Sequence, residues 1–126
     1  MIAKRRLGST DLQLSLIGLG TVKFGRNTSA KYPDAFELPN MQQITELLEL
    51  AQNQGINTLD TAPAYGDSEQ KLGLIFKQNT KTSLARDNWI IITKACEEYA
   101  NNQSSYNFSA NYINNSINNS LKTLNT

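Results

Sequence analysis

Apolar and polar residues follow one another along this chain in short runs whose period changes several times. Apolar runs of a few residues, bounded by glycine or polar residues, predict β-strands. Segments in which apolar residues recur every three or four positions, as at Ile44, Leu48 and Ala51, predict amphipathic helices. The predicted strands are Arg5–Leu7, Leu12–Ser15, Ile17–Gly20, Ile56–Asp60 and Trp89–Thr93.

Three helices are predicted from the helical period and from the residues that flank it. Gly55 is expected to end the first helix, because glycine readily adopts the left-handed conformation that often follows a helix. The segment Lys23–Pro39 has no clear period and is predicted to be a loop, as is the polar segment before the last helix. The predicted helices are 41–54, 68–78 and 109–124, with Asn40, Ser68 and Ser109 as their N-caps.

The order of these elements indicates an α/β fold in a single domain over residues 1–126. A β-hairpin comes first and three βα units follow it. Strands that alternate with helices of 10–15 residues are typical of parallel sheets, with right-handed crossovers. Three such units can begin either a doubly wound sheet or a (β/α)8 barrel, and the periodicity does not choose between them.

Composition and charge exclude several kinds of function. The 12 basic and 11 acidic residues give a net charge of +1, which does not suit nucleic acid or an acidic membrane surface. No apolar run is long enough for a membrane span, so no membrane partner is expected. The single cysteine, Cys96, is compatible with a reducing, cytoplasmic setting. Because the chain has no histidine, a metal site is not expected, and acid–base chemistry falls to Asp, Glu, Lys, Tyr or Cys.

Residues that can move protons follow the ends of the predicted parallel strands. In parallel α/β proteins the site lies at the carboxyl ends of the strands. Asp60, Tyr65 and Lys94 all follow such ends and are expected to share one rim. A lysine ammonium beside a phenol favours loss of the phenol proton, and a carboxylate keeps that lysine charged. The alternative is that Asp60 only caps a loop and Lys94 is solvated.

Five segments in register resemble the aldo-keto reductase family, and together they span nearly the whole chain. The most diagnostic is Gly55–Gly66, which contains Asp60 and Tyr65 and continues into Ser68-Glu69. The other matching segments are Arg6–Ser15, Ile17–Thr21 with Phe24-Gly25, Thr93-Lys94 and Ser120–Leu124.

The resemblance implies a TIM (β/α)8 barrel that reduces a small-molecule aldehyde or ketone with NADPH. It implies that Tyr65 gives a proton to the carbonyl oxygen, that Lys94 assists the tyrosine and that Asp60 pairs with the lysine. It also implies that the backbone of Gly20 and Thr21 lies near the nicotinamide ribose, together with Asp60.

Two departures from the family pattern affect these expectations. The family's fourth catalytic residue is a histidine of the fourth barrel strand, and this chain is expected to be an N-terminal portion truncated before that strand. It is therefore expected to be inactive alone. The alternatives are one half of a split two-chain reductase, with a complementary C-terminal half as partner, and a non-catalytic interaction module. Cys96 stands where the family commonly has a small residue such as glycine. Either the cysteine is a harmless small side chain at this position, or it indicates that the position is under relaxed constraint.

Overall fold

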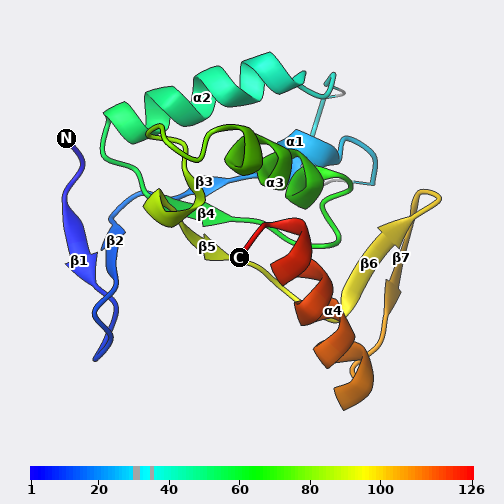
Figure 1. Ribbon diagram of the computed structural model, residues 1–126. Helices are drawn as coiled ribbons and strands as arrows, with labels where there is room; N and C mark the ends of the chain where they lie inside the picture. Colours follow the sequence, from blue (N-terminus) through cyan, green and yellow to red (C-terminus); the bar gives the residue numbers. More distant parts are fainter. Residues whose placement is uncertain (30–31, 35) are drawn as a thin grey trace.

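The computed structural model describes residues 1–29, 32–34 and 36–126. At its centre is a parallel sheet of β3 (Leu19–Gly20), β4 (Thr58–Asp60) and β5 (Ile90–Ile92), in the order β3-β4-β5 (Figure 1). Gly20 is in register with Asp60, which is in register with Ile92, so the three carboxyl ends are level. The predicted parallel α/β arrangement is confirmed, although each strand is shorter than predicted.

Helices α2 (Met41–Asn53) and α3 (Ser68–Gln78) lie on the same side of this sheet, and α4 (Ala110–Thr123) packs beside α3 (Figure 1). The packing of α4 on α3 is close, because a Cβ added to Gly73 would lie 1.9 Å from the carbonyl oxygen of Thr123. All three predicted helices are confirmed. Two short helical turns also occur, α1 (Val22–Gly25) and the 3₁₀ turn η1 (Arg86–Asn88).

The core lies between the sheet and these helices. Helix α2 begins with a capping box, in which Asn40 accepts from the backbone of Gln43 and the Gln43 side chain accepts from Asn40. Gly55, with φ of 89°, follows its end as predicted. Full burial of each large apolar side chain contributes about 1.5–3 kcal/mol. The largest fully buried apolar residues are Phe76, Ile44, Leu48, Leu59, Leu72, Ile75 and Leu84.

The N-terminal hairpin pairs β1 (Lys4–Arg6) with β2 (Gln13–Ser15), about one residue from the predicted positions. Asn57 joins it to the start of β4. Its side-chain oxygen accepts from the Ser15 amide at 2.8 Å, and its side-chain nitrogen donates to the Gln13 carbonyl at 2.8 Å.

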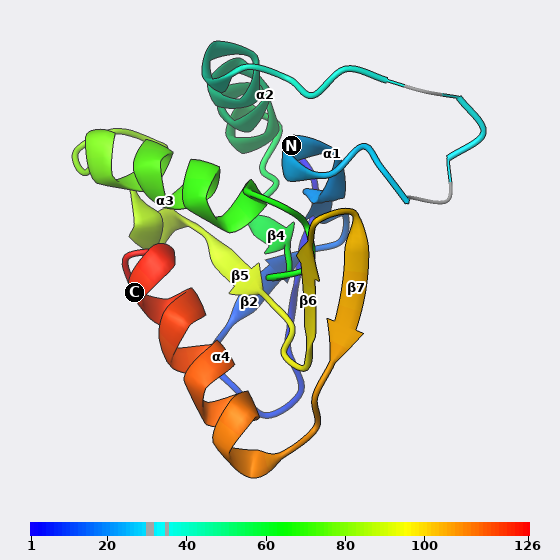
Figure 2. The same ribbon diagram turned by 90° about the vertical axis from the view of Figure 1, so that its right-hand side faces the viewer.

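A second hairpin, β6 (Glu97–Ala100) and β7 (Gln103–Tyr106), occupies the segment predicted to be a polar loop, and that prediction was wrong. Its two turn residues, Asn101 and Asn102, have φ of 52° and 61°, which suits a tight hairpin turn. Figure 2 shows the hairpin beside the carboxyl end of β5.

Two further differences concern loops and caps. The expected Lys23–Pro39 loop begins with α1, and Ala30, Lys31 and Ala35 within it lie outside the described residues. Ser68 is not the cap of α3: Asp67 holds that position without a side-chain hydrogen bond, and Ser68 is the first helical residue. In the part of the chain that the structure describes, no helix has the length and hydropathy needed to cross a bilayer.

Candidate active site

The structure brings Asp60, Tyr65 and Lys94 together at the carboxyl rim of the sheet. The Lys94 ammonium nitrogen lies 2.6 Å from Oδ1 of Asp60 and 4.8 Å from the centre of the Tyr65 ring. The Tyr65 hydroxyl lies 3.5 Å from the same Asp60 oxygen. Lys94 therefore faces the rim, not the helix layer, and one carboxylate oxygen contacts both the amine and the phenol. The catalytic roles expected of these residues stay predictions.

The environment of Lys94 keeps it protonated. Partial burial, the largest single effect, lowers its pKa, but hydrogen bonds and Coulomb attraction to Asp60 and Tyr65 together outweigh it. The net result is a pKa of Lys94 above the ordinary lysine value. The ammonium also donates to the Thr61 carbonyl at 3.0 Å, so two contacts with the end of β4 fix its direction.

The loop that carries Tyr65 is seated on the backbone of α1. A Cβ added to Gly25 would lie 2.2 Å from the Tyr65 carbonyl oxygen, and one added to Gly66 would lie 2.0 Å from the Gly25 carbonyl oxygen. Only glycine at both positions allows so close an approach, and Gly66 also has φ of 61°. The Phe24-Gly25 and Tyr65-Gly66 segments therefore pack backbone against backbone, and each needs the glycine of the other.

Thr21 supports the rim from below. It is fully buried, and both its amide and its hydroxyl donate to the Asp60 carbonyl, at 2.9 and 3.0 Å. The Ser68 hydroxyl lies 2.9 Å from the Thr21 hydroxyl and 3.1 Å from its carbonyl. Gly20, by contrast, is exposed, and a Cβ added there would meet nothing within 4 Å. Of the three residues expected near a cofactor, Gly20 and Asp60 are accessible to solvent. Thr21 is buried, and its contacts hold the backbone of Asp60 in place.

Sequence reasoning missed Arg26, which joins three segments of the rim. Its guanidinium donates to the Ala64 carbonyl, next to Tyr65, at 3.1 Å and stacks on the Tyr99 ring of β6 at 3.7 Å from the ring centre. It also lies 3.7 Å from the carboxylate of Glu97. Nothing in the periodicity marks Arg26, because Ala64, Tyr99 and Glu97, its contacts elsewhere on the rim, are 38 or more positions away in the chain.

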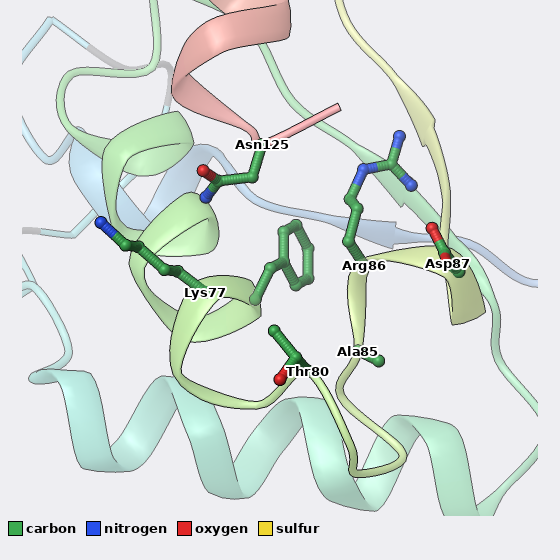
Figure 3. A pocket seen from close by; sticks show the side chains of 7 residues that line it. Lys77, Thr80, Ala85, Arg86, Asp87 and Asn125 are labelled. Carbon is green, nitrogen blue, oxygen red and sulfur yellow. The ribbon is translucent and has the colours of Figure 1, made fainter.

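A cavity of about 240 Å³ lies at the opposite end of the sheet and does not belong to this rim (Figure 3). It involves the end of α3 and the turn η1, which precedes β5, whereas Lys94 follows β5. Its lining residues are Phe76, Lys77, Thr80, Ala85, Arg86, Asp87 and Asn125.

The chain is a parallel α/β protein with an Asp–Lys–Tyr group at the carboxyl ends of its strands. Comparison with known proteins shows to which family it belongs. The model of the Aldo/keto reductase family matches residues 16–126. Aldo-keto reductase YhdN of Bacillus subtilis (strain 168) is 33% identical over 122 residues. The chain therefore belongs to the aldo/keto reductase family.

Solved structures agree with this assignment. A putative aldo-keto reductase from Pseudomonas aeruginosa is 41% identical with a TM-score of 0.80, over 98% of this chain and 42% of that one. Aldo-keto reductase AKR11C1 of Bacillus halodurans, in its holo form, is 25% identical with a TM-score of 0.72, over 100% of this chain and 37% of that one. The match with YhdN covers 95% of this chain and 34% of that protein, so the chain spans about a third of this relative.

Proposed function

We propose that this chain supplies the first three βα units and the proton-donor rim of a reductase that acts on aldehydes or ketones with NADPH. The observation that carries the proposal is the Asp60–Lys94 contact of 2.6 Å beside the Tyr65 phenol. Membership of the aldo/keto reductase family supports carbonyl reduction as the reaction. A cytoplasmic setting is part of the same proposal.

The residues of the rim fit a nicotinamide cofactor. A Cβ added to Gly20 would meet nothing within 4 Å, so no neighbouring atom blocks the approach of a cofactor to the end of β3. Within residues 1–29, 32–34 and 36–126, the side-chain contacts of Asp60 use Oδ1, so Oδ2 is the oxygen available to a ribose hydroxyl. When bound, NADPH would supply the hydride for the carbonyl carbon. Gly20, Thr21 and Asp60 are the residues proposed to hold it here.

In the proposed reaction the chain's own residues handle the proton. Tyr65 donates its hydroxyl proton to the carbonyl oxygen of the substrate as negative charge develops there. Lys94, held in its charged form, stabilises the phenolate that remains on Tyr65. Asp60 holds the ammonium close to the phenol and offsets its charge. The rim therefore contains a proton donor, a cation and an orienting carboxylate.

We propose that the site is completed by a complementary segment equivalent to the rest of a (β/α)8 barrel. In the described part of the chain, β5 pairs with β4 alone, which leaves one edge of β5 open. Beside that edge lies a hollow of about 180 Å³. Its apolar lining residues are Ile91 of β5, Ile117 and Leu121 of α4, and Leu124, and the other half of its lining is polar. The exposed Ile117 and Leu121 stand along it, one helical turn apart. This open, partly apolar edge supports completion of the sheet by a further barrel segment along β5 and α4.

A chimera tests the proposed function. Residues 1–126 would be fused to the unmatched remainder of the Pseudomonas aeruginosa relative, and aldehyde-dependent NADPH oxidation would be followed at 340 nm. We expect turnover by the chimera and a loss of about a hundredfold or more with Tyr65→Phe, since general acid catalysis typically contributes 10²–10⁴-fold. Tyr106→Phe, which alters an exposed tyrosine of β7, is the matched control. A folded chimera whose turnover is unaffected by Tyr65→Phe would contradict the proposal.

A further inference from the structure

Glu69 is a buried carboxylate that has no part in the proposed reaction. It is the second residue of α3 and only 5% exposed. Burial of a carboxylate is costly unless both oxygens find partners. The Thr93 hydroxyl donates to its Oε1 at 2.6 Å, and the Ser120 hydroxyl donates to its Oε2 at 3.0 Å. Two neutral hydroxyls therefore satisfy this carboxylate, and the bond to Thr93 is short.

The two hydroxyls come from different parts of the molecule. Ser120 belongs to α4, so its bond joins two helices. Thr93 directly precedes Lys94, so its bond joins α3 to the backbone of the rim. Thr93 reaches the helix layer, whereas Lys94 reaches Asp60, so these consecutive side chains leave the backbone on opposite sides. A side chain fixed on one side limits how the backbone can turn, and with it the direction of the next side chain.

We propose that Glu69 is a positioning residue for Lys94, acting through the Thr93 hydroxyl to keep the ammonium directed at Asp60 and Tyr65. The proposal rests on the proposed reductase function, since Lys94 serves the proton donor of that site. Hydrogen bonds to a carboxylate are roughly twice as strong as those between neutral groups, which suits a fixed anchor. The bond to Ser120 provides an internal comparison, because it uses the same carboxylate without touching the rim.

The test compares Thr93→Val with Ser120→Ala in the full chain of 126 residues, labelled with ¹³C at lysine. The probe is the titration of the Lys94 side chain by NMR, with Lys94→Arg used to assign its signal. The raised pKa of Lys94 depends on its hydrogen bonds and Coulomb attraction to Asp60 and Tyr65. We expect its midpoint to fall towards the ordinary lysine value in Thr93→Val and to stay unchanged in Ser120→Ala.

Each outcome decides the proposal. An unchanged midpoint in a folded Thr93→Val chain would overturn it. Equal shifts in both variants would also overturn it, because they would assign the shift to altered packing around Glu69 and not to the direction of Lys94. If circular dichroism shows that Thr93→Val is unfolded, Thr93→Ala decides instead, because it also removes the hydroxyl that donates to Glu69 and leaves every charge in place. A lowered midpoint in Thr93→Ala then supports positioning, and an unchanged midpoint overturns it.

The same pair of variants in the active chimera separates this inference from the proposed function. Thr93→Val should lower kcat about tenfold with KM unchanged, because a misdirected ammonium weakens the transition state more than the bound substrate. Ser120→Ala removes the other hydroxyl partner of Glu69 and should keep a kcat well above that of Thr93→Val, because Ser120 is not next to Lys94 in the chain. The titration needs no turnover, so an inactive chimera would count against the reductase proposal while leaving the positioning of Lys94 measurable. Equal kcat values for the two variants would overturn the positioning role.

Discussion

At the residue scale, Cys96 has a backbone conformation that suits glycine better than a residue with a side chain. Its φ is 83°, in the left-handed region where a Cβ atom crowds the backbone. Its carbonyl accepts from the Asn107 amide at 2.9 Å, which ties the base of the β6–β7 hairpin and holds the strained conformation in place. A glycine would adopt this backbone conformation without strain, which agrees with the small residue that the resemblance implies at this position.

Cys96→Gly is expected to raise the free energy of unfolding by about 0.5–1 kcal/mol. Relief of the left-handed strain, about 1–2 kcal/mol, exceeds the added entropy of the unfolded glycine chain. The midpoint of urea unfolding measures the change. Cys96→Ala is the control: it removes the sulfur but keeps the Cβ, so it should give no gain. An equal gain from alanine would assign the effect to the thiol instead of the backbone.

At the element scale, the β6–β7 hairpin shows where sequence patterns stop being informative. Its strands are short and mostly polar, so they lack the apolar alternation by which strands are recognised. The pair Asn101-Asn102 was the available signal, because asparagine tolerates the positive φ of a two-residue turn. Contacts with the segment that follows α1 hold the hairpin in place. Tyr99 stacks on Arg26, and its hydroxyl lies 2.6 Å from that of Thr28.

Arg26→Gln is expected to destabilise the chain by about 1–3 kcal/mol and to loosen the hairpin. The guanidinium side chain is only 10% exposed and combines a cation–π contact with hydrogen bonds to backbone carbonyls. Urea unfolding and amide hydrogen exchange over β6 and β7 measure the two effects.

Arg6→Gln provides the matched control for Arg26→Gln. Arg6 also donates to backbone carbonyls and pairs with Asp11, but it is the last residue of β1 and its side chain is exposed. Its substitution should cost less than about 1 kcal/mol and leave β6–β7 exchange unchanged. Equal losses in the two variants would mean that Arg26 does not hold the hairpin.

At the scale of the whole molecule, the sheet order and the rim were predictable because strand alternation and strand ends are local features. The parallel order places Asp60 and Lys94 at one edge whatever the details of packing. The supports of the rim were not predictable. Ser68 has the appearance of a helix cap but bonds to Thr21, 47 positions away, and Glu69 bonds to Ser120 across 51 positions. Such long-range polar contacts depend on tertiary packing that no local pattern encodes.

The open side of β5 gives the last prediction, which concerns assembly. The chain alone should show no measurable NADPH turnover with simple aldehydes, because positioning of the reactants can contribute about 7–11 kcal/mol and most of the relatives' length is absent from it. Mixed with the remainder of the Pseudomonas aeruginosa relative as a separate chain, it should gain turnover. Leu121→Asp places a charge in the partly apolar hollow beside β5 and should weaken this association about tenfold or more.

Leu50→Asp is the control for assembly, because Leu50 is an exposed leucine on α2, away from that hollow. It should leave turnover of the mixture unchanged, and both variants should keep the far-UV circular dichroism of the parent chain. The concentration of the complementary chain at half-maximal turnover measures the affinity. If Leu121→Asp and Leu50→Asp require the same concentration, the complementary segment does not bind along β5 and α4. Turnover by the chain alone would show instead that its rim holds substrate and cofactor without a partner.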